Sequence, residues 1–324
     1  SGVKAMREAL RREKPDVVNV HNLFPFITPA ALRECKKAGV PVIMTVHNFR
    51  LICPTGLFMR DNRPCELCLE KGNEWGCVRY NCEHSILKSV GYAARNAVAR
   101  LRRHYADCVD CFACITDFQR RKLIAAGFPA EKIVVIPNSI DGGKEPESSK
   151  GDYVAFSGRI SGEKGVDLIV EAARRNPGIQ FRLAGAVRDK DLVEKLPGNV
   201  RLMGHLSGEE FERFNADARF FVMASRCYEG FPMAILEAAR YGKPTIAPDH
   251  GGFSEIIGKG SDAIGVLFTP NDAEALSDAI ARLWASPAEC NSLGKKSYKA
   301  LCTRYSSSLI SLLWHNLISS FHHN

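Results

Sequence analysis

Two glutamates, Glu229 and Glu237, stand in the segment that carries the strongest chemical signal of the sequence, CYEGFPMAILEA. Seven residues separate them, and the segment follows an apolar run and opens a predicted helix. Gly230 suits a tight turn there, and Pro232 suits the first helical turn. Backbone N–H groups at such a turn favour an oxygen-rich or anionic ligand. The two carboxylates can therefore contact different parts of one extended ligand.

A second segment with chemical potential is SGRISGEKG, residues 157–165, which joins a predicted strand to a predicted helix. Arg159 can supply a planar guanidinium fork and Lys164 a point charge, and a pyrophosphate needs such cations. Gly158 gives the backbone freedom for close approach. Taken alone, a loop of this kind is typical of a solvated turn. Its position before the glutamate pair in one βα domain predicts a diphosphate site.

The glutamate segment resembles the paired-glutamate motif of family 4 retaining glycosyltransferases of the GT-B fold, a group with many bacterial members. The resemblance implies that Glu229 contacts hydroxyl groups of a donor sugar and that Glu237 binds the ribose of the nucleotide. It also implies main-chain contacts to the sugar from Gly230 and Phe231. The loop 157–165 resembles the diphosphate site of the same family.

Three smaller segments agree with this resemblance. IPNSID, which contains Asn138, is similar to the proline–asparagine segment before the interdomain hinge of the family. DHGGFSE, which contains Gly252, is similar to a later glycine pair near the nucleotide and sugar. His47 ends a predicted strand where related enzymes place a histidine beside the donor, and it is preferred over His21, which ends another strand. Each segment alone could equally be a capped turn or a structural histidine.

The resemblance implies transfer of a glycosyl group from a nucleoside diphosphate sugar with retention at the anomeric carbon. In such a same-face reaction the departing phosphate receives the acceptor proton, and the protein stabilises charge. Arg159 and Lys164 would meet the diphosphate, while His47 and Glu229 would position the sugar. Metal-independent donor binding is typical of the family, so the resemblance implies that no catalytic metal is needed. A glycan or lipid-linked acceptor, as in polysaccharide biosynthesis, is the expectation from bacterial family members.

Predicted helices and strands alternate along the chain, which indicates an α/β fold with parallel sheets. We expect two Rossmann-like doubly wound domains that face a cleft, where such folds bind ligands. The expected boundaries are 1–145 for an acceptor-side domain, 146–305 for a nucleotide-sugar domain and 306–324 for a helix packing across the domains. Residues 142–152 (GGKEPESSKGD) have the composition of a linker. The predicted strands are 16–20, 40–46, 111–116, 133–136, 153–157, 179–184, 200–203, 219–223, 244–247 and 266–268.

The front of the sequence departs from the family pattern. Family members begin with a strand and a glycine-rich loop that borders the acceptor cleft, whereas this chain opens Ser-Gly-Val-Lys and enters a predicted helix. We therefore expect an incomplete first domain, by truncation or by reduction. The specificity for the acceptor would be affected most.

Twelve cysteines are present, and five of them lie in residues 49–84, a segment without clear periodicity. Four have the spacing C-x2-C-x8-C-x4-C and could enclose a tetrahedral structural zinc, namely Cys65, Cys68, Cys77 and Cys82. Cys53 or His84 could replace one of these ligands. The alternative is a set of free or buried thiols in a variable loop.

The 324 residues carry a formal net charge of +8, which points to an anionic partner. The densest basic stretch is 95–103 (RNAVARLRR), which we interpret as a solvated helix face in preference to a contact with anionic lipid. No nucleic-acid-binding motif accompanies the charge. No run of eighteen apolar residues is present, so we expect a cytoplasmic protein, with peripheral contact to the inner face of the membrane left open. The sequence makes no prediction of oligomeric state.

Other functions remain as alternatives to a transferase. A non-catalytic module that binds nucleotide sugars, or one organised by zinc for protein interaction, fits the departure at the front of the chain. A nucleotide-sugar epimerase of the same fold would need an acid–base set near the sugar, which we do not find. A dehydrogenase would need a GxGxxG fingerprint with a downstream acid, which the sequence lacks.

Overall fold

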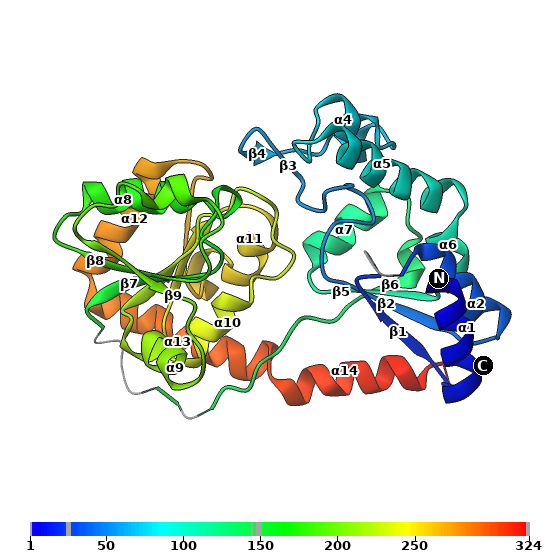
Figure 1. Cartoon of the computed structure of the whole chain (residues 1–324). Helices are drawn as coiled ribbons and strands as arrows, with labels where there is room; N and C mark the ends of the chain where they lie inside the picture. The colour runs from blue at the N-terminus through cyan, green and yellow to red at the C-terminus, as the bar shows by residue number, and fades with distance from the viewer. Residues whose placement is uncertain (1, 24–26, 144, 147–150, 322–324) are drawn as a thin grey trace. The chain divides into compact units, whose positions relative to one another are not determined.

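The structure is a computed structural model that describes residues 2–23, 27–143, 145–146 and 151–321. The chain divides into two compact units, each built on a parallel sheet (Figure 1). Unit 1 comprises Ser1–Arg60, Cys65–Pro137 and Ile310–Asn324, and unit 2 comprises Asp61–Pro64 and Asn138–Leu309. Part of the predicted linker, residues 144 and 147–150, lies outside the described residues.

Unit 1 contains a four-stranded parallel sheet with the strand order β1-β2-β5-β6 among the residues described. The strands are β1 (Val18–His21), β2 (Val42–Val46), β5 (Cys111–Cys114) and β6 (Ile133–Val135). Every residue of β2 is buried, in agreement with its largely apolar sequence, VIMTV. Helices of this unit are α1 (Gly2–Glu13), α2 (Leu32–Lys37), α5 (Ile86–Leu101), α6 (His104–Cys108) and α7 (Asp117–Ala125), with short 3-10 helices at Pro29–Ala31 and Ala130–Lys132.

The C-terminal helix α14 (Ser307–Ser319) packs on the sheet of unit 1. Trp314 and Leu317 contact a buried cluster that contains Ile43 of β2 and Ala113 of β5. The last helix of the chain therefore buries a face of the first sheet (Figure 1).

The sequence of residues 86–106 predicts one continuous helix, and this prediction is wrong, because the structure has two helices there, α5 and α6. Arg103 has a φ of 51°, in the left-handed region, and this residue separates α5 from α6. A single residue of this conformation is enough to end an α-helix.

The cysteine-containing segment 49–84 holds a two-stranded sheet and two short helices. These elements are β3 (Met59–Arg60), β4 (Arg63–Pro64), α3 (Leu67–Glu70) and α4 (Trp75–Arg79). Phe49 and Phe58 are both 1% exposed, and their ring centroids lie 5.0 Å apart. Buried aromatic packing thus anchors the segment.

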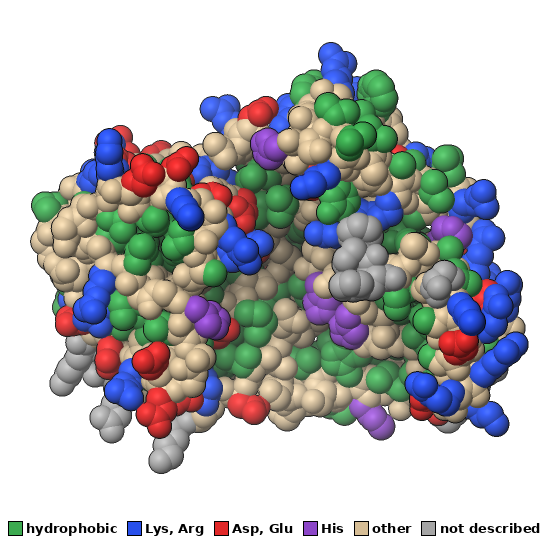
Figure 2. Space-filling view, in the orientation of Figure 1, with side chains coloured by type: hydrophobic (Ala, Val, Ile, Leu, Met, Phe, Trp, Pro, Cys, Tyr) green, Lys and Arg blue, Asp and Glu red, His purple; other side chains and the backbone are tan. Residues whose placement is uncertain are grey.

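An apolar surface covers part of α4 and α5. Its exposed side chains are Trp75, Tyr80, Ile86, Leu87, Val90, Val98 and Leu101. Hydrophobic and basic side chains lie together over these two helices in Figure 2. We call this set of residues the α4–α5 surface. In the part of the chain that the structure describes, no helix is both long and apolar enough to cross a membrane.

Unit 2 contains a six-stranded sheet with the order β12-β11-β10-β7-β8-β9, and all its strand pairs in the described ranges are parallel. The strands are β7 (Tyr153–Ser157), β8 (Gln180–Ala184), β9 (Val200–Gly204), β10 (Phe220–Val222), β11 (Thr245–Pro248) and β12 (Val266–Phe268). The helices are α8 (Val166–Arg175), α9 (Gly208–Asp217), α10 (Met233–Arg240), α11 (Gly251–Ile257), α12 (Ala273–Ala285) and α13 (Pro287–Arg304), with short 3-10 helices at Gly162–Lys164, Lys190–Val193 and Gly260–Asp262.

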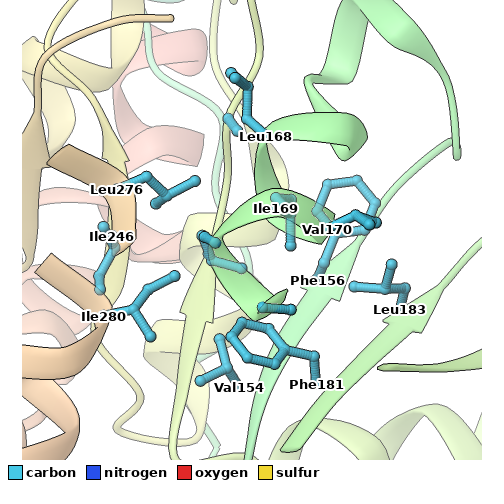
Figure 3. Packing of buried hydrophobic residues seen from close by; sticks show 14 of the residues in the cluster. Val154, Phe156, Leu168, Ile169, Val170, Phe181, Leu183, Ile246, Leu276 and Ile280 are labelled. Carbon is cyan, nitrogen blue, oxygen red and sulfur yellow. The ribbon is translucent and has the colours of Figure 1, made fainter. Parts of the chain in front are cut away.

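The core of unit 2 lies between its sheet and the helices α8 and α12 (Figure 3). Val154 and Phe156 of β7 point into this core, where they meet Ile169 of α8 and Ile280 of α12. In the sheet, β8 and β9 lie on one side of β7, and β10 lies on the other side. The direction of winding therefore reverses between β7 and β10, and ligands of open α/β sheets bind at such a switch point.

Candidate functional site

Three loops of unit 2 leave the carboxyl ends of neighbouring strands at the switch point. Residues 158–165 follow β7, residues 223–232 follow β10, and residues 249–250 follow β11. Because these strands are parallel and adjacent, the three loops lie at one edge of the sheet. The loop after β7 carries the predicted cations Arg159 and Lys164, and the loop after β10 carries the predicted acid Glu229.

The side chains of Lys164 and Glu229 meet at this edge. Lys164 Nζ donates a hydrogen bond to Glu229 Oε1, and Ser225 Oγ donates to the same oxygen at 2.9 Å. The lysine and glutamate side chains are 18% and 17% exposed, so the ion pair is largely shielded from water. Burial by itself lowers the pKa of Lys164, but the charge and hydrogen bond of Glu229 outweigh burial and raise it. The ammonium therefore stays charged near neutral pH.

The side chain of Arg226, which is 8% exposed, joins the loop after β10 to the loop after β7. Its guanidinium donates to both carboxylate oxygens of Asp167 at 2.6 Å and to the Gly162 carbonyl at 2.9 Å. Its backbone N–H donates to the Glu163 carbonyl at 2.9 Å. Arg226 thereby holds the turn that carries Lys164. No local sequence pattern marks Arg226, because its partners lie about 60 residues away in the chain.

Glycines at two positions permit the close approach of these loops. A Cβ on Gly165, whose φ is +65°, would lie 2.0 Å from the carbonyl oxygen of Ala224. A Cβ on Gly252 would lie 2.5 Å from the carbonyl oxygen of Gly230, and the Gly252 N–H donates to the Glu229 carbonyl at 3.0 Å. The start of α11 therefore packs against the turn that carries Glu229, as expected if Gly252 belongs to the same site.

Glu237 lies on α10, the helix that follows the Glu229 turn. It is half-buried, and burial raises the pKa of its carboxyl group. No hydrogen bond or ion pair to its side chain is formed by the residues that the structure describes. Because no described residue occupies them, the carboxylate oxygens of Glu237 can accept hydrogen bonds from a hydroxyl-bearing ligand.

The remaining residues predicted for unit 2 have different surroundings. Arg159 is 55% exposed and pairs with Glu163 at 3.3 Å, and Gly158 begins the same loop. Phe231 is 7% exposed, with its ring centroid 5.4 Å from that of Tyr305, so its side chain packs and its main chain alone could contact a sugar. Asn138 lies at the first residue of the long segment of unit 2, and the described contacts do not bring it to the Lys164–Glu229 pair.

A histidine that sequence analysis did not single out lies beside the glutamate turn. The Nε2 atom of His250 lies 2.9 Å from the carbonyl oxygen of Ser225, and its ring lies 5.5 Å from that of Tyr228. Burial lowers the pKa of His250, which favours the neutral imidazole. The signal was present in the sequence, since His250 precedes the glycine pair that was noted there.

In unit 1, the dipeptide His-Asn occurs at the ends of two adjacent strands. His21 Nδ1 lies 2.7 Å from His47 Nε2, and the two rings are stacked with centroids 5.0 Å apart. Asn48 donates to Asn22 Oδ1 at 2.8 Å. Burial, followed by the proximity of His21, lowers the pKa of His47. His21, the less favoured candidate in the sequence, is thus a direct partner of His47.

None of the predicted zinc ligands Cys65, Cys68, Cys77 and Cys82 forms a disulfide in the part of the chain that the structure describes. In the described ranges, no three histidine, cysteine, aspartate or glutamate side chains form a group that could hold a metal ion. The residues present therefore do not fit the predicted tetrahedral zinc site. A hydrogen bond with Cys82, followed by burial, raises the pKa of Cys77, which favours a thiol over a metal-binding thiolate.

Two protein families match the chain in succession. Glycosyltransferase Family 4 matches residues 1–142, and Glycosyl transferases group 1 matches residues 140–300. The boundary between the two matches falls close to Pro137, where the long segment of unit 1 ends.

Among curated relatives, the α-D-kanosaminyltransferase of Streptomyces kanamyceticus is 26% identical, over 87% of this chain and 71% of its own length. The exopolysaccharide phosphotransferase of Streptomyces coelicolor is 31% identical, over 66% of this chain and 24% of its own length. The amylovoran biosynthesis glycosyltransferase AmsK of Erwinia amylovora is 29% identical, over 52% of this chain and 46% of its own length. The chain thus spans about a quarter of the length of the exopolysaccharide phosphotransferase, less than half of AmsK and less than three quarters of the kanosaminyltransferase.

Solved structures show the same fold. Anabaena HepE, crystallised in complex with UDP, has a TM-score of 0.72 and 17% identity, covering 98% of this chain and 82% of its own. Sucrose-phosphate synthase from Thermosynechococcus elongatus has a TM-score of 0.71 and 17% identity, covering 99% and 77%. Two Rossmann-like units and the two family matches lead to one assignment: the chain belongs to the family 4 glycosyltransferases of the GT-B fold.

Proposed function

We propose that this protein is a retaining glycosyltransferase that moves a sugar from a nucleoside diphosphate sugar to a polysaccharide or lipid-linked acceptor. One observation carries the proposal: a largely buried lysine and a glutamate meet at the switch point of the six-stranded sheet, at Lys164 and Glu229. A cation beside an acid at this place suits a ligand with a diphosphate next to a sugar. Similar proteins support the proposal, because HepE was crystallised with UDP-glucose and AmsK is an amylovoran biosynthesis glycosyltransferase.

Each residue has a proposed role in donor binding. Lys164, with Arg159, neutralises the diphosphate as negative charge develops on it. Glu229 accepts hydrogen bonds from the sugar hydroxyls, and Glu237 accepts them from the ribose. Gly158, Gly230, Gly252 and the main chain of Phe231 contribute the close backbone approach, and Asn138 lies in the segment that enters unit 2. His47 contributes the neutral imidazole beside the sugar.

The proposed reaction proceeds on one face of the sugar. The bond from the anomeric carbon to the diphosphate oxygen breaks, and a bond to the acceptor oxygen forms on the same face. The acceptor proton passes to the departing phosphate oxygen, so that no protein carboxylate forms a covalent intermediate. Positioning and charge stabilisation by the protein then supply the rate enhancement.

Each part of the chain has its own proposed role. Residues 1–145 would form the acceptor-side domain, residues 146–305 the nucleotide-sugar domain, and residues 306–324 the closing helical segment. The α4–α5 surface supports a peripheral contact with a membrane that carries a lipid-linked acceptor, because exposed Leu87 and Leu101 stand beside basic Lys88 and Arg102. Co-sedimentation with anionic vesicles, compared with neutral vesicles, tests this contact.

A donor screen followed by product analysis tests the proposed function. Calorimetric titration of the full chain with nucleotide sugars identifies the donor, and release of nucleoside diphosphate in the presence of glycan and lipid-linked acceptors measures turnover. Glu229→Gln should abolish turnover while leaving the fold intact by circular dichroism. An anomeric configuration opposite to that of the donor would refute retention. Donor binding without turnover on any acceptor would favour a non-catalytic nucleotide-sugar module.

A further inference from the structure

The backbone that carries the His250 ring is anchored to the sheet of unit 2. His250 lies two residues beyond the end of β11, and its N–H donates to the Pro248 carbonyl at 2.8 Å. The N–H of the preceding residue, Asp249, donates to the Phe268 carbonyl of β12 at 2.8 Å. Regular structure therefore fixes the place from which the ring extends.

The loop between β10 and α10, residues 223–232, depends on its neighbours for its position. All of its residues are described, and none of them belongs to a helix or strand. The Nε2 atom of His250 lies 2.9 Å from the carbonyl oxygen of Ser225 in this loop. A carbonyl oxygen can only accept, so Nε2 carries the hydrogen of this bond. The anchored ring thus holds the loop at Ser225.

Ser225 connects this bond to the candidate donor site. Its Oγ donates to Glu229 Oε1 at 2.9 Å, and the same oxygen accepts a hydrogen bond from Lys164. A displacement of the Ser225 backbone would therefore move one of the donors that orient the carboxylate. His250, Ser225 and Glu229 form a relay from the sheet to the acid that the sugar needs.

The surroundings of the ring give it no other polar partner. Its centroid lies 5.5 Å from that of Tyr228 and 6.0 Å from that of Phe253. Nδ1 is buried and has no hydrogen-bond partner among the described residues. An acceptor buried in this way costs free energy, which an apolar side chain between the two aromatic rings would avoid. The bond to Ser225 is thus what a histidine contributes at this position.

We propose that His250 is a positioning residue for the donor sugar, which holds Ser225 and through it orients the Glu229 carboxylate toward the sugar hydroxyls. The inference rests on the proposed function, in which Glu229 accepts hydrogen bonds from those hydroxyls. Lys164 belongs to the loop after β7, which the guanidinium of Arg226 holds separately. Loss of the His250 bond should therefore disturb recognition of the sugar more than recognition of the diphosphate.

Calorimetry on the full chain tests the inference with paired probes. These are UDP-glucose, UDP-N-acetylglucosamine and GDP-mannose, each compared with the UDP or GDP that it contains. His250→Leu keeps a similar volume and removes the donor, so it should weaken binding of the nucleotide sugar at least fivefold, as for the loss of one hydrogen bond. The affinity for UDP or GDP alone should change less than twofold. His250→Gln should restore most of the affinity for the nucleotide sugar, because its amide nitrogen can take the place of Nε2.

A double-variant experiment tests whether His250 acts through Ser225. Ser225→Ala removes the Oγ that donates to Glu229 and should by itself weaken binding of the nucleotide sugar. In this background His250→Leu should have little further effect, because both substitutions act on one carboxylate. His315→Ala, which removes an exposed histidine from α14, is the control and should change each affinity less than twofold.

The outcomes separate this inference from the proposed function. Normal binding of the nucleotide sugar by His250→Leu overturns the inference alone, as does an equal loss of affinity for the nucleotide sugar and for its nucleoside diphosphate. Additive effects of the two substitutions also overturn it. If His250→Leu does not fold, as judged by circular dichroism, Ser225→Ala decides, and unchanged affinities in that variant refute the relay. If the unmodified protein binds none of these probes, the proposed function fails and the inference fails with it.

Discussion

Lys164 and Glu229 form an ion pair between residues that are 65 positions apart in the chain. The lysine ends the turn after β7, and the glutamate lies in the loop after β10, so the pair spans the switch point of the sheet. Their shielding from water strengthens the interaction between them and with a charged ligand. The pair fixes a cation and an acid at the position where a diphosphate sugar would need both.

Gly252→Ala should weaken donor binding without unfolding the protein. Its Cβ would meet the Gly230 carbonyl oxygen at 2.5 Å, so the turn that carries Glu229 must shift. A displacement of this kind is sufficient to lower turnover by about 100-fold. Gly178→Ala is the matched control, since its Cβ meets no atom within 4 Å, and it should retain full activity. Equal donor affinity in the two variants, measured by calorimetry, would contradict the packing described here.

Asp167→Asn should loosen the turn that carries Lys164. The substitution removes the carboxylate that receives two hydrogen bonds from buried Arg226, and we expect a loss of about 1–3 kcal/mol in unfolding free energy. Nucleoside diphosphate affinity should fall as well, because Lys164 is held less firmly. Asp152→Asn serves as a control, since its ion pair with Arg182 is 3.7 Å long and its side chain is 78% exposed. Urea unfolding of both variants measures the difference, which should be absent if Arg226 has no positioning role.

The histidine pair predicts a dependence of stability on pH. The folded state lowers the pKa of His47 below its ordinary value, so the unfolded chain binds more protons as the pH falls. The contribution of His47 to stability is therefore present above a pH of about 6.5 and is lost as the pH decreases through the folded-state pKa. Between pH 8 and 5.5, the unfolding free energy of His47→Gln should decline less than that of the unmodified protein. Parallel pH profiles in urea unfolding would show that His47 makes no such contribution.

Sequence patterns predicted the sheet of unit 2 closely. The predicted strands 153–157 and 266–268 coincide with β7 and β12. For β7 the reason is burial on both faces, which gives a continuous apolar run between turn residues. The loops with Lys164 and Glu229 were also found at the expected strand ends. Periodicity failed at Arg103, since a single residue of left-handed conformation leaves no mark on the hydrophobic pattern.

Contacts between distant segments were beyond the reach of the sequence. The partnership of His21 with His47 spans 26 residues, and that of Arg226 with Asp167 spans 59. Neither follows a local spacing rule, and each depends on which strands become neighbours. The cysteine spacing predicted a zinc site that the described residues do not form. Thiols with suitable separations in the sequence need not converge on one point in the fold.

The affinity of Lys164→Met for a nucleoside diphosphate tests the central claim most directly. Calorimetry should show at least tenfold weaker binding, about 1.4 kcal/mol or more, because the shielded cation for the diphosphate is lost. Lys190→Met, which removes an exposed lysine from the same unit, should bind like the unmodified protein. Unchanged affinity in a correctly folded Lys164→Met protein would contradict the placement of the donor diphosphate at the switch point.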